Sequence, residues 1–168
     1  GELIRSPSFT IFPRYHQLRA SKKLAENVKE HVNTNNTLGK KYLINHSAGS
    51  GKTLTIAWMA DLLDSLYSTE NEKIFDNIII LTDRRSLYKN VKDDLEKFTH
   101  LQTKLNFTKH SGDLANFLDR NRAIIVTTIQ KFGHIQDKLK SSDELKNRKV
   151  AFLIDEAHRS QDGKMALK

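Results

Sequence analysis

Four short apolar runs, separated by longer amphipathic stretches, constrain the fold of this sequence most. They lie at 41–45 (KYLIN), 77–82 (NIIILT), 123–128 (AIIVTT) and 150–155 (VAFLID), and they are rich in β-branched residues. Runs of this length and composition are typical of strands that are buried on both faces. Strands that alternate with helices form a parallel sheet, so the sequence predicts an α/β fold.

Helical periodicity fills the stretches between these runs. Apolar residues recur at i, i+3 and i+4 in three sets: Leu24, Val28 and Val32; Ile56, Met59, Ala60 and Leu63; Leu87, Val91, Leu95 and Phe98. Each set makes one apolar face, which predicts an amphipathic helix. The polar breaks at 33–41, 68–73 and 141–149 are expected to be surface loops. The helix in the first 40 residues is expected to pack at the edge of the first strand.

Length and composition narrow the possibilities further. The chain has 168 residues with 38% hydrophobic content, which predicts one domain, 1–168, made of an N-terminal segment (1–40) and a core (41–168). It has no cysteine, so disulfides and thiolate zinc sites are excluded. The net charge of +8 weakly favours phosphate-rich partners.

The expected location of the protein in the cell is inferred from targeting signals that the sequence lacks. The apolar runs are far shorter than the roughly 20 residues of a membrane helix, and the N-terminus lacks a secretory pattern. We therefore expect a soluble, cytoplasmic protein without membrane contact. Because the chain begins at Gly1 and stops shortly after an acidic motif, we expect it to be a piece of a longer protein.

A glycine-rich stretch after the first expected strand carries the clearest chemistry. Residues 46–53 read HSAGSGKT, in which Gly49 and Gly51 let backbone N–H groups turn inward. The helix that begins near Lys52 directs the positive end of its dipole to the same place. The Lys52 ammonium can reach β and γ phosphates, and the Thr53 hydroxyl can ligate a Mg²⁺ ion shared with them. The expected phosphate cradle consists of Ser47, Ala48, Gly49, Ser50, Gly51, Lys52 and Thr53. The alternative is a flexible glycine loop in which Lys-Thr follows by chance.

Two adjacent carboxylates end the last expected strand. The motif DEAH runs from Asp155 to His158, at the strand end where open α/β sheets bind ligands. Asp155 can hold Mg²⁺ through water, and Glu156 can take a proton from the water that attacks the γ-phosphate. The sequence thus predicts nucleotide hydrolysis, with Lys52, Asp155 and Glu156 as catalytic residues. The alternative is an acid pair that only favours the next helix.

Five segments, in order, resemble superfamily-two helicases and translocases, and within them the motor subunit of type I restriction enzymes. They read FPRYHQ (12–17), HSAGSGKT (46–53), ILTDRRSL (80–87), VTTIQKF (126–132) and LIDEAHRSQ (153–161). Phosphate loops usually begin with glycine where this chain has His46, but a histidine there is ordinary in the restriction motors. The resemblance implies one RecA-like domain with ATP at the C-terminal ends of the strands.

The resemblance also implies roles for single residues. Gln17, with Arg14 nearby, is similar to the motif that reads adenine, because a side-chain amide both donates and accepts. An ordinary packed N-terminal segment is the alternative reading of Gln17. His158 resembles the family's link between the nucleotide site and the nucleic-acid path.

The resemblance implies contacts with the DNA backbone for residues at the ends of the second and later expected strands and in the loops after them. These are Arg84, Arg85, Thr127, Thr128, Gln130 and Lys131. Their guanidinium, hydroxyl, amide and ammonium groups bind phosphate without reading sequence, as a motor on DNA requires. Structural alternatives remain, because Thr128 can cap a helix starting near Ile129 and Arg84 can pair with Asp83 or Asp93.

By the same resemblance, the parent protein is an ATP-driven translocase of double-stranded DNA and a type I site-specific endonuclease. Its cofactors are ATP and Mg²⁺, and its partners are methylation and specificity subunits. A second RecA-like domain and a nuclease domain lie outside this piece, so we expect the piece alone to bind MgATP weakly and hydrolyse it poorly. The alternatives are a helicase acting on RNA or in DNA repair, and a nucleotide-binding switch without motor function.

Overall fold

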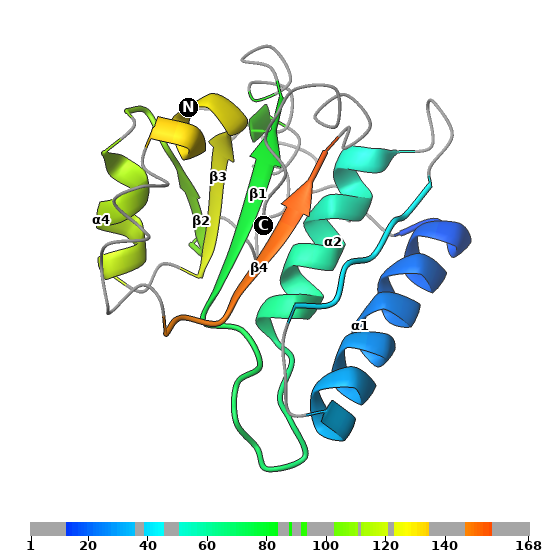
Figure 1. Cartoon of the computed structure of the whole chain (residues 1–168). Coiled ribbons are helices and arrows are strands. Elements are labelled where there is room, and N and C mark those ends of the chain that lie inside the picture. The colour runs from blue at the N-terminus through cyan, green and yellow to red at the C-terminus, as the bar shows by residue number, and fades with distance from the viewer. Residues whose placement is uncertain are drawn as a thin grey trace, which may run out of the picture.

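The computed structural model describes residues 13–35, 39–45, 51–83, 88, 92–93, 103–110, 112–120, 123–134 and 147–155. The elements in chain order are α1 (Tyr15–Asn35), α2 (Lys52–Asp64), β1 (Asn77–Thr82), β2 (Leu105–Phe107), α4 (Asp113–Asp119), β3 (Ile124–Thr128) and β4 (Val150–Ile154). The four strands form one parallel sheet in the order β2-β3-β1-β4 (Figure 1). The expected α/β fold with a parallel sheet is therefore confirmed.

The two inner strands, β1 and β3, are buried along their whole length. Ile78 of β1 pairs with Ile124 of β3. Successive side chains of a strand point to opposite faces of the sheet, so Ile80 joins the core on one face while Ile79 and Leu81 join the core on the other. Burial on both faces explains why these strands are continuous apolar runs in the sequence.

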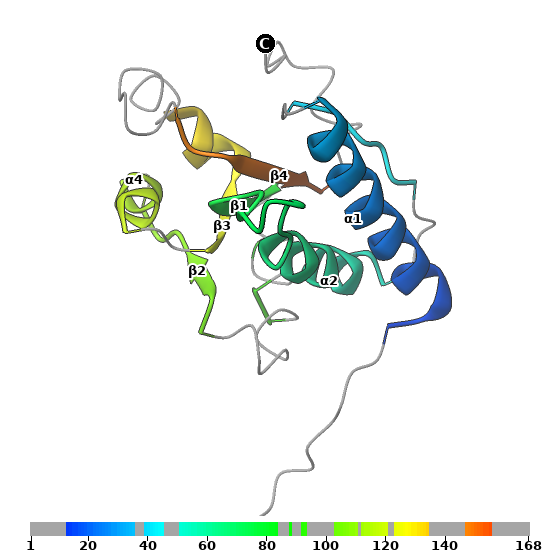
Figure 2. The ribbon, with the colours of Figure 1, turned by 90° about the horizontal axis from the view of Figure 1, so that it is seen from below.

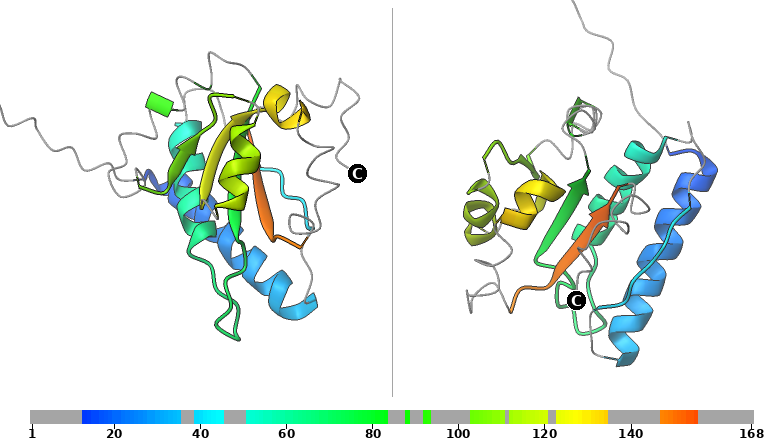
Figure 3. Two further views of the ribbon diagram at one scale, coloured as in Figure 1. Left: turned by 90° about the vertical axis from the view of Figure 1, so that its left-hand side faces the viewer. Right: turned by 45° about the horizontal axis from the view of Figure 1, so that its top comes forward.

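Helices cover both faces of the sheet (Figure 2). On one face α2 packs on β1, and α1 adds Leu24 and Val28 to the same core cluster. On the other face α4 contributes Leu114 and Leu118. The right-hand view of Figure 3 shows α2 between the sheet and α1. The expected apolar face of α2 is confirmed, since its four residues are all buried: Ile56, Met59, Ala60 and Leu63.

The prediction of a strand at 41–45 is wrong. The segment has no strand conformation, Leu43 is 88% exposed, and Ile44 is 36% exposed. Within the described part of the chain, no strand of the sheet pairs with it. Apolar composition favours an extended backbone, but a strand also needs a partner for its N–H and C=O groups. Consequently α1 packs along α2 rather than on the edge of a strand at 41–45.

Strand β2 has no counterpart among the expected runs, because it contains only three half-buried residues at the edge of the sheet. The expected helix around 87–98 lies mostly outside the described residues. Within this range the structure describes Tyr88, Lys92 and Asp93, and all three are helical. None of the helices in the described ranges is long and apolar enough to cross a membrane.

Candidate nucleotide-binding site

The candidate site lies where the C-terminal ends of the parallel strands meet. Helix α2 begins at this same edge of the sheet, as Figure 1 shows. Lys52 is the first residue of α2, and Asp155 directly follows β4. The backbone N–H of Asp155 donates to the Leu81 carbonyl of β1 at 3.0 Å, which fixes the position of Asp155 beside the centre of the sheet. The parallel topology therefore brings together two residues that are far apart in the sequence.

Lys52 and Asp155 form an ion pair. The distance from Lys52 Nζ to Asp155 Oδ1 is 3.0 Å, and the Asp155 side chain is only 4% exposed. A buried carboxylate without a cation nearby would carry a large desolvation penalty. The Lys52 ammonium reduces that penalty, and it lies at the place where the sequence predicts phosphate groups.

One oxygen of the Asp155 carboxylate has no hydrogen-bond donor within the described part of the chain. Its Oδ1 lies at ion-pair distance from Lys52, but it accepts no hydrogen bond from any described residue. Buried polar atoms in folded proteins nearly always have a hydrogen-bond partner, so such an atom is a position for a water molecule or an ion. An acidic oxygen also suits Mg²⁺, which keeps several of its waters and prefers oxygen ligands. The residues present therefore fit the magnesium ion that the sequence predicts at Asp155 and Thr53.

The start of α2 is arranged to receive an anion. Gly51 precedes the helix with φ 76° and ψ 40°, a left-handed conformation that glycine adopts without strain. Among the described residues, no side chain caps this end, and the first turn carries no acidic residue. The N–H groups of a first helical turn have no partner within the helix and attract negative charge. Lys52 and Thr53 belong to this turn.

Gln17 lies directly against the phosphate loop. Its Nε2 donates to the Gly51 carbonyl at 2.9 Å, and its Oε1 accepts from the Arg14 backbone N–H at 2.8 Å. The second contact is a capping-box bond, because Gln17 is the third residue of α1 and Arg14 is its N-cap. The structure thus joins the expected adenine segment to the expected phosphate segment.

Several predicted site residues lie outside the described part of the chain. They are Ser47, Ala48, Gly49 and Ser50 of the loop, with His46 before them; Glu156 and His158 of the acidic motif; and Arg84 and Arg85 after β1. Arg14, Gln17, Gly51, Lys52, Thr53 and Asp155 are the described members of the predicted nucleotide site.

The two threonines expected to contact DNA are buried. Thr127 is 0% exposed, and its Oγ1 accepts a hydrogen bond of 2.8 Å from Thr108 Oγ1. Thr128 is 3% exposed, and its Oγ1 accepts from the Lys131 backbone N–H at 3.3 Å. The second bond is a cap on the helical residues 129–134, which was the structural alternative for Thr128. In this conformation neither side chain faces solvent.

Gln130 and Lys131 lie closer to the surface at the same edge. Gln130 is exposed, and its Nε2 donates to the Asp83 carbonyl at 3.0 Å. The Lys131 ammonium donates to the Thr108 carbonyl at 2.6 Å and lies 5.1 Å from the centroid of the Tyr88 ring. Burial raises the pKa of the Tyr88 hydroxyl. That hydroxyl donates to the Thr108 carbonyl at 2.9 Å.

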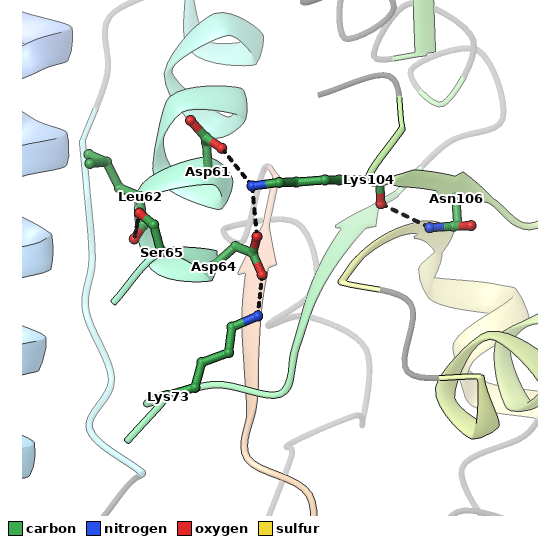
Figure 4. Close-up of polar contacts among 7 residues, drawn as sticks. All are labelled: Asp61, Leu62, Asp64, Ser65, Lys73, Lys104 and Asn106. Atoms are coloured by element: carbon green, nitrogen blue, oxygen red, sulfur yellow. Dashed lines mark hydrogen bonds and ion pairs between the residues drawn. The ribbon is translucent and has the colours of Figure 1, made fainter. Parts of the chain in front are cut away.

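An ion cluster at the other end of α2 has no counterpart in the sequence analysis (Figure 4). Lys73 Nζ lies 2.7 Å from Asp64 Oδ1, and Lys104 Nζ lies 3.0 Å from Asp64 Oδ2 and 3.5 Å from Asp61 Oδ1. Burial opposes ionisation of Asp64, but the two lysines together outweigh it and lower the pKa of this carboxyl. Its bond to Asp64 raises the pKa of Lys104. A helix C-terminus repels negative charge, so the two acids Asp61 and Asp64 near the end of α2 were the sequence signal that could have predicted nearby lysine partners.

The fold and the site define a RecA-like α/β ATPase domain. The SWI2/SNF2 ATPase family model matches residues 16–168, so the chain belongs to that family. Among the described residues, no group of His, Cys, Asp and Glu side chains could hold a metal ion by itself.

Within that class, the chain is similar to endonuclease subunits of type I restriction enzymes. It is 34% identical over 172 residues to the provisionally named C-terminal part of the type I restriction enzyme MpnIIP endonuclease subunit of Mycoplasma pneumoniae, covering 97% of this chain and 79% of that protein. It is 37% identical over 122 residues to the SsaAORF53P endonuclease subunit of Staphylococcus saprophyticus, covering 71% of this chain and 12% of that protein. The relationship expected from the motifs is confirmed: the chain belongs to this group of restriction subunits.

Proposed function

We propose that this chain is the ATP-driven motor domain of a type I restriction endonuclease subunit and that it translocates double-stranded DNA. The observation that carries the proposal is the 3.0 Å ion pair between Lys52 at the start of α2 and Asp155 at the end of β4. It joins one residue of the predicted phosphate loop to one residue of the predicted acidic motif. The similarity to restriction endonuclease subunits supports the same function.

Each residue of the site has a part in this proposal. Bound MgATP supplies the phosphoanhydride bond, and its metal ion neutralises charge on the phosphates. The backbone N–H groups of residues 47–53 and the Lys52 ammonium bind the phosphates. Thr53 and Asp155 hold the metal, and the Glu156 carboxylate accepts the proton of the attacking water. Arg14 and Gln17 contact the adenine, and His158 couples the site to the DNA path.

The Lys52–Asp155 pair gives the domain a stable state without nucleotide. Each partner neutralises the other while Asp155 is buried. Phosphate offers Lys52 a stronger acceptor with several oxygens, and a divalent cation offers Asp155 twice the charge. Nucleotide binding therefore exchanges partners at this pair rather than exposing an isolated buried charge.

The proposed DNA path follows the same edge of the sheet. Arg84, Arg85, Gln130 and Lys131 contact backbone phosphates, and the net charge of +8 favours this interaction. Thr127 and Thr128 contribute through their buried hydrogen bonds, which hold the end of β3 in place. Replacing Lys131 with Ala should weaken binding to all DNA sequences alike and reduce the dependence of log affinity on log salt by about one phosphate contact.

We also propose that residues 1–168 form the N-terminal RecA-like domain of a longer motor. The chain spans 12% of the S. saprophyticus relative and 16% of the relative from Methanocaldococcus jannaschii, to which it is 28% identical over 171 residues. A second RecA-like domain and a nuclease domain, with methylation and specificity subunits as partners, complete the proposed enzyme. The domain alone then hydrolyses ATP poorly.

The test measures ATP turnover by the full-length protein with its partner subunits, in the presence and absence of linear double-stranded DNA. We expect strong stimulation by duplex DNA that Glu156→Gln abolishes. Stimulation by RNA alone would contradict translocation of DNA and favour a helicase. If the protein binds MgATP, loses that binding in Lys52→Ala and shows no stimulated turnover, the motor function is contradicted and a nucleotide-binding switch is favoured. Brisk turnover by the 168-residue chain alone would contradict the need for a second domain.

A further inference from the structure

The Gly51 carbonyl, at the last position before α2, receives three hydrogen bonds. Two come from Thr55 in the same helix, through its backbone N–H at 3.1 Å and its Oγ1 at 3.2 Å. The third comes from Gln17 Nε2 at 2.9 Å. Gln17 is the donor that belongs to another element, so its bond ties the start of α1 to the end of the phosphate loop.

The Gln17 side chain is held firmly in this position. It is 2% exposed, and its Oε1 accepts the N–H of Arg14 at 2.8 Å. The network also fixes which end of the amide faces Gly51. Reversing the amide would bring two oxygens together at Gly51 and two N–H groups together at Arg14. One planar group therefore satisfies a donor on its own helix and an acceptor on the loop.

This contact controls the direction of a peptide group in the proposed phosphate cradle. The peptide that joins Gly51 to Lys52 is planar and trans, so its C=O and its N–H point in opposite directions. The Gln17 and Thr55 donors hold the carbonyl on the protein side. The N–H of Lys52 must then point away from these donors, out of the N-terminal end of α2.

Residue 51 must be glycine for the contact to form. A Cβ atom at Gly51 would lie 2.5 Å from Gln17 Nε2, far inside contact distance. The positive φ of 76° adds strain for any other residue. The glycine before Lys52 thus serves the close approach of Gln17 as well as the turn of the loop.

We propose that Gln17 is a positioning residue for phosphate binding, acting through the Gly51–Lys52 peptide independently of any contact with the base. The inference rests on the proposed nucleotide site and adds a role to a residue that the motif resemblance connects with adenine. An amide that reads adenine discriminates between bases. An amide that aims the Lys52 N–H strengthens binding of any polyphosphate, including one without a base.

The test replaces Gln17 with Met, which preserves volume and helix propensity but removes the amide. Dissociation constants are measured by calorimetry on the full chain for MgATP, MgGTP and magnesium tripolyphosphate. Loss of one hydrogen bond that orients the Gly51–Lys52 peptide should weaken all three ligands, magnesium tripolyphosphate included, by about five- to tenfold. Loss of the proposed adenine contact adds a further decrease for MgATP alone. Weaker binding of MgATP alone, with tripolyphosphate unchanged, would overturn the inference and leave Gln17 as an adenine reader.

A matched control separates positioning from general damage to α1. Ser21 is 1% exposed, and its Oγ donates to the backbone carbonyl of Gln17 at 2.9 Å, one turn before it in the same helix. Ser21→Ala should leave all three affinities within twofold of the unmodified chain. If it weakens them as much as Gln17→Met does, the effect belongs to the helix and the inference fails.

A second measurement requires no ligand. In a ¹H–¹⁵N spectrum, Gln17→Met should shift the Lys52 amide resonance clearly more than Ser21→Ala does, because the peptide loses a donor at its carbonyl. An unmoved Lys52 resonance would contradict the inference even if affinities fall. If the unmodified chain binds neither MgATP nor magnesium tripolyphosphate while the Lys52 resonance still responds to Gln17→Met, the nucleotide function fails and the positioning contact stands.

Discussion

The two ends of α2 each place a lysine beside a buried aspartate, but they differ in how completely that aspartate is satisfied. At the C-terminal end, both oxygens of Asp64 have a lysine within 3.0 Å. At the N-terminal end, Oδ1 of Asp155 lies 3.0 Å from Lys52 and accepts no hydrogen bond from the described residues. Among the described residues, each oxygen of Asp64 therefore has a lysine partner, whereas Oδ1 of Asp155 can still accept a hydrogen bond or bind a cation.

This difference separates a structural cluster from a candidate site. A fully satisfied buried network stabilises one arrangement, because any change leaves a charge unpaired. An incompletely satisfied group can exchange partners at lower cost. Substitutions at the Asp64 end should therefore change stability and spare nucleotide binding, and substitutions at the Lys52 end should do the reverse.

The largest expected effect is on ATP turnover in Lys52→Ala. Removing the ammonium takes away a charge-assisted contact to the phosphates, and losses of this kind reduce turnover by about 100-fold or more. Steady-state turnover of the full-length protein with DNA checks the expectation. The matched control is Lys73→Ala at the opposite end of α2, which should retain normal turnover. Equal losses in both variants would mean that the two ends do not differ in role.

The next largest effect is on stability when Asp64 loses both lysines. In a Lys73→Met, Lys104→Met double variant the buried carboxylate has no lysine partner, and the free energy of unfolding should fall by about 3 kcal/mol. Urea denaturation at neutral pH measures this change. The control is Lys149→Met, which breaks an exposed 3.8 Å pair with Glu72 and should cost about 0.5 kcal/mol or less. Similar losses in the two proteins would show that the Asp64 cluster contributes no more than a surface pair.

A smaller effect concerns the pH dependence of stability. The lysines hold the pKa of Asp64 below its ordinary value despite burial. A carboxyl whose pKa is lowered on folding stabilises the protein above its unfolded pKa of about 3.9 and loses that contribution as pH falls through the folded pKa. As the pH falls from about 5 to the acid transition, Asp64→Asn should lose less stability than the unmodified chain. Identical acid limbs in urea denaturation would contradict a lowered pKa.

The sequence predicts the centre of the fold well because burial on both faces leaves a clear mark. β1 and β3 are continuous apolar runs, and the face of α2 is read from its periodicity. The segment at 41–45 shows the limit of this signal, because its composition resembles a buried strand while Leu43 is 88% exposed. Whether such a run pairs depends on a partner elsewhere in the chain, and local composition contains no information about that partner.

The candidate site was predictable where it depends on strand direction. The parallel order places Asp155 near Lys52, since both stand at the C-terminal edge of the sheet. Contacts that depend on how two elements pack against each other were not predictable. Gln17 reaches Gly51 only because α1 lies along α2, and Lys104 reaches Asp64 only because β2 starts beside the end of α2.

The smallest expected effect is at Thr55, and it sharpens the comparison within the N-terminal end itself. Thr55→Val keeps the shape of the side chain and removes one of the three donors to the Gly51 carbonyl. The Thr55 backbone N–H and Gln17 remain, so the free energy of unfolding should fall by about 0.5 kcal/mol and the affinity for magnesium tripolyphosphate by less than about twofold. Calorimetry on the same ligand as for Gln17→Met gives the comparison. The Thr55 hydroxyl and the Gln17 amide both donate to the Gly51 carbonyl oxygen, but only the amide belongs to another helix. A loss in Thr55→Val as large as that in Gln17→Met would mean that the number of donors, rather than the link to α1, sets the direction of the peptide.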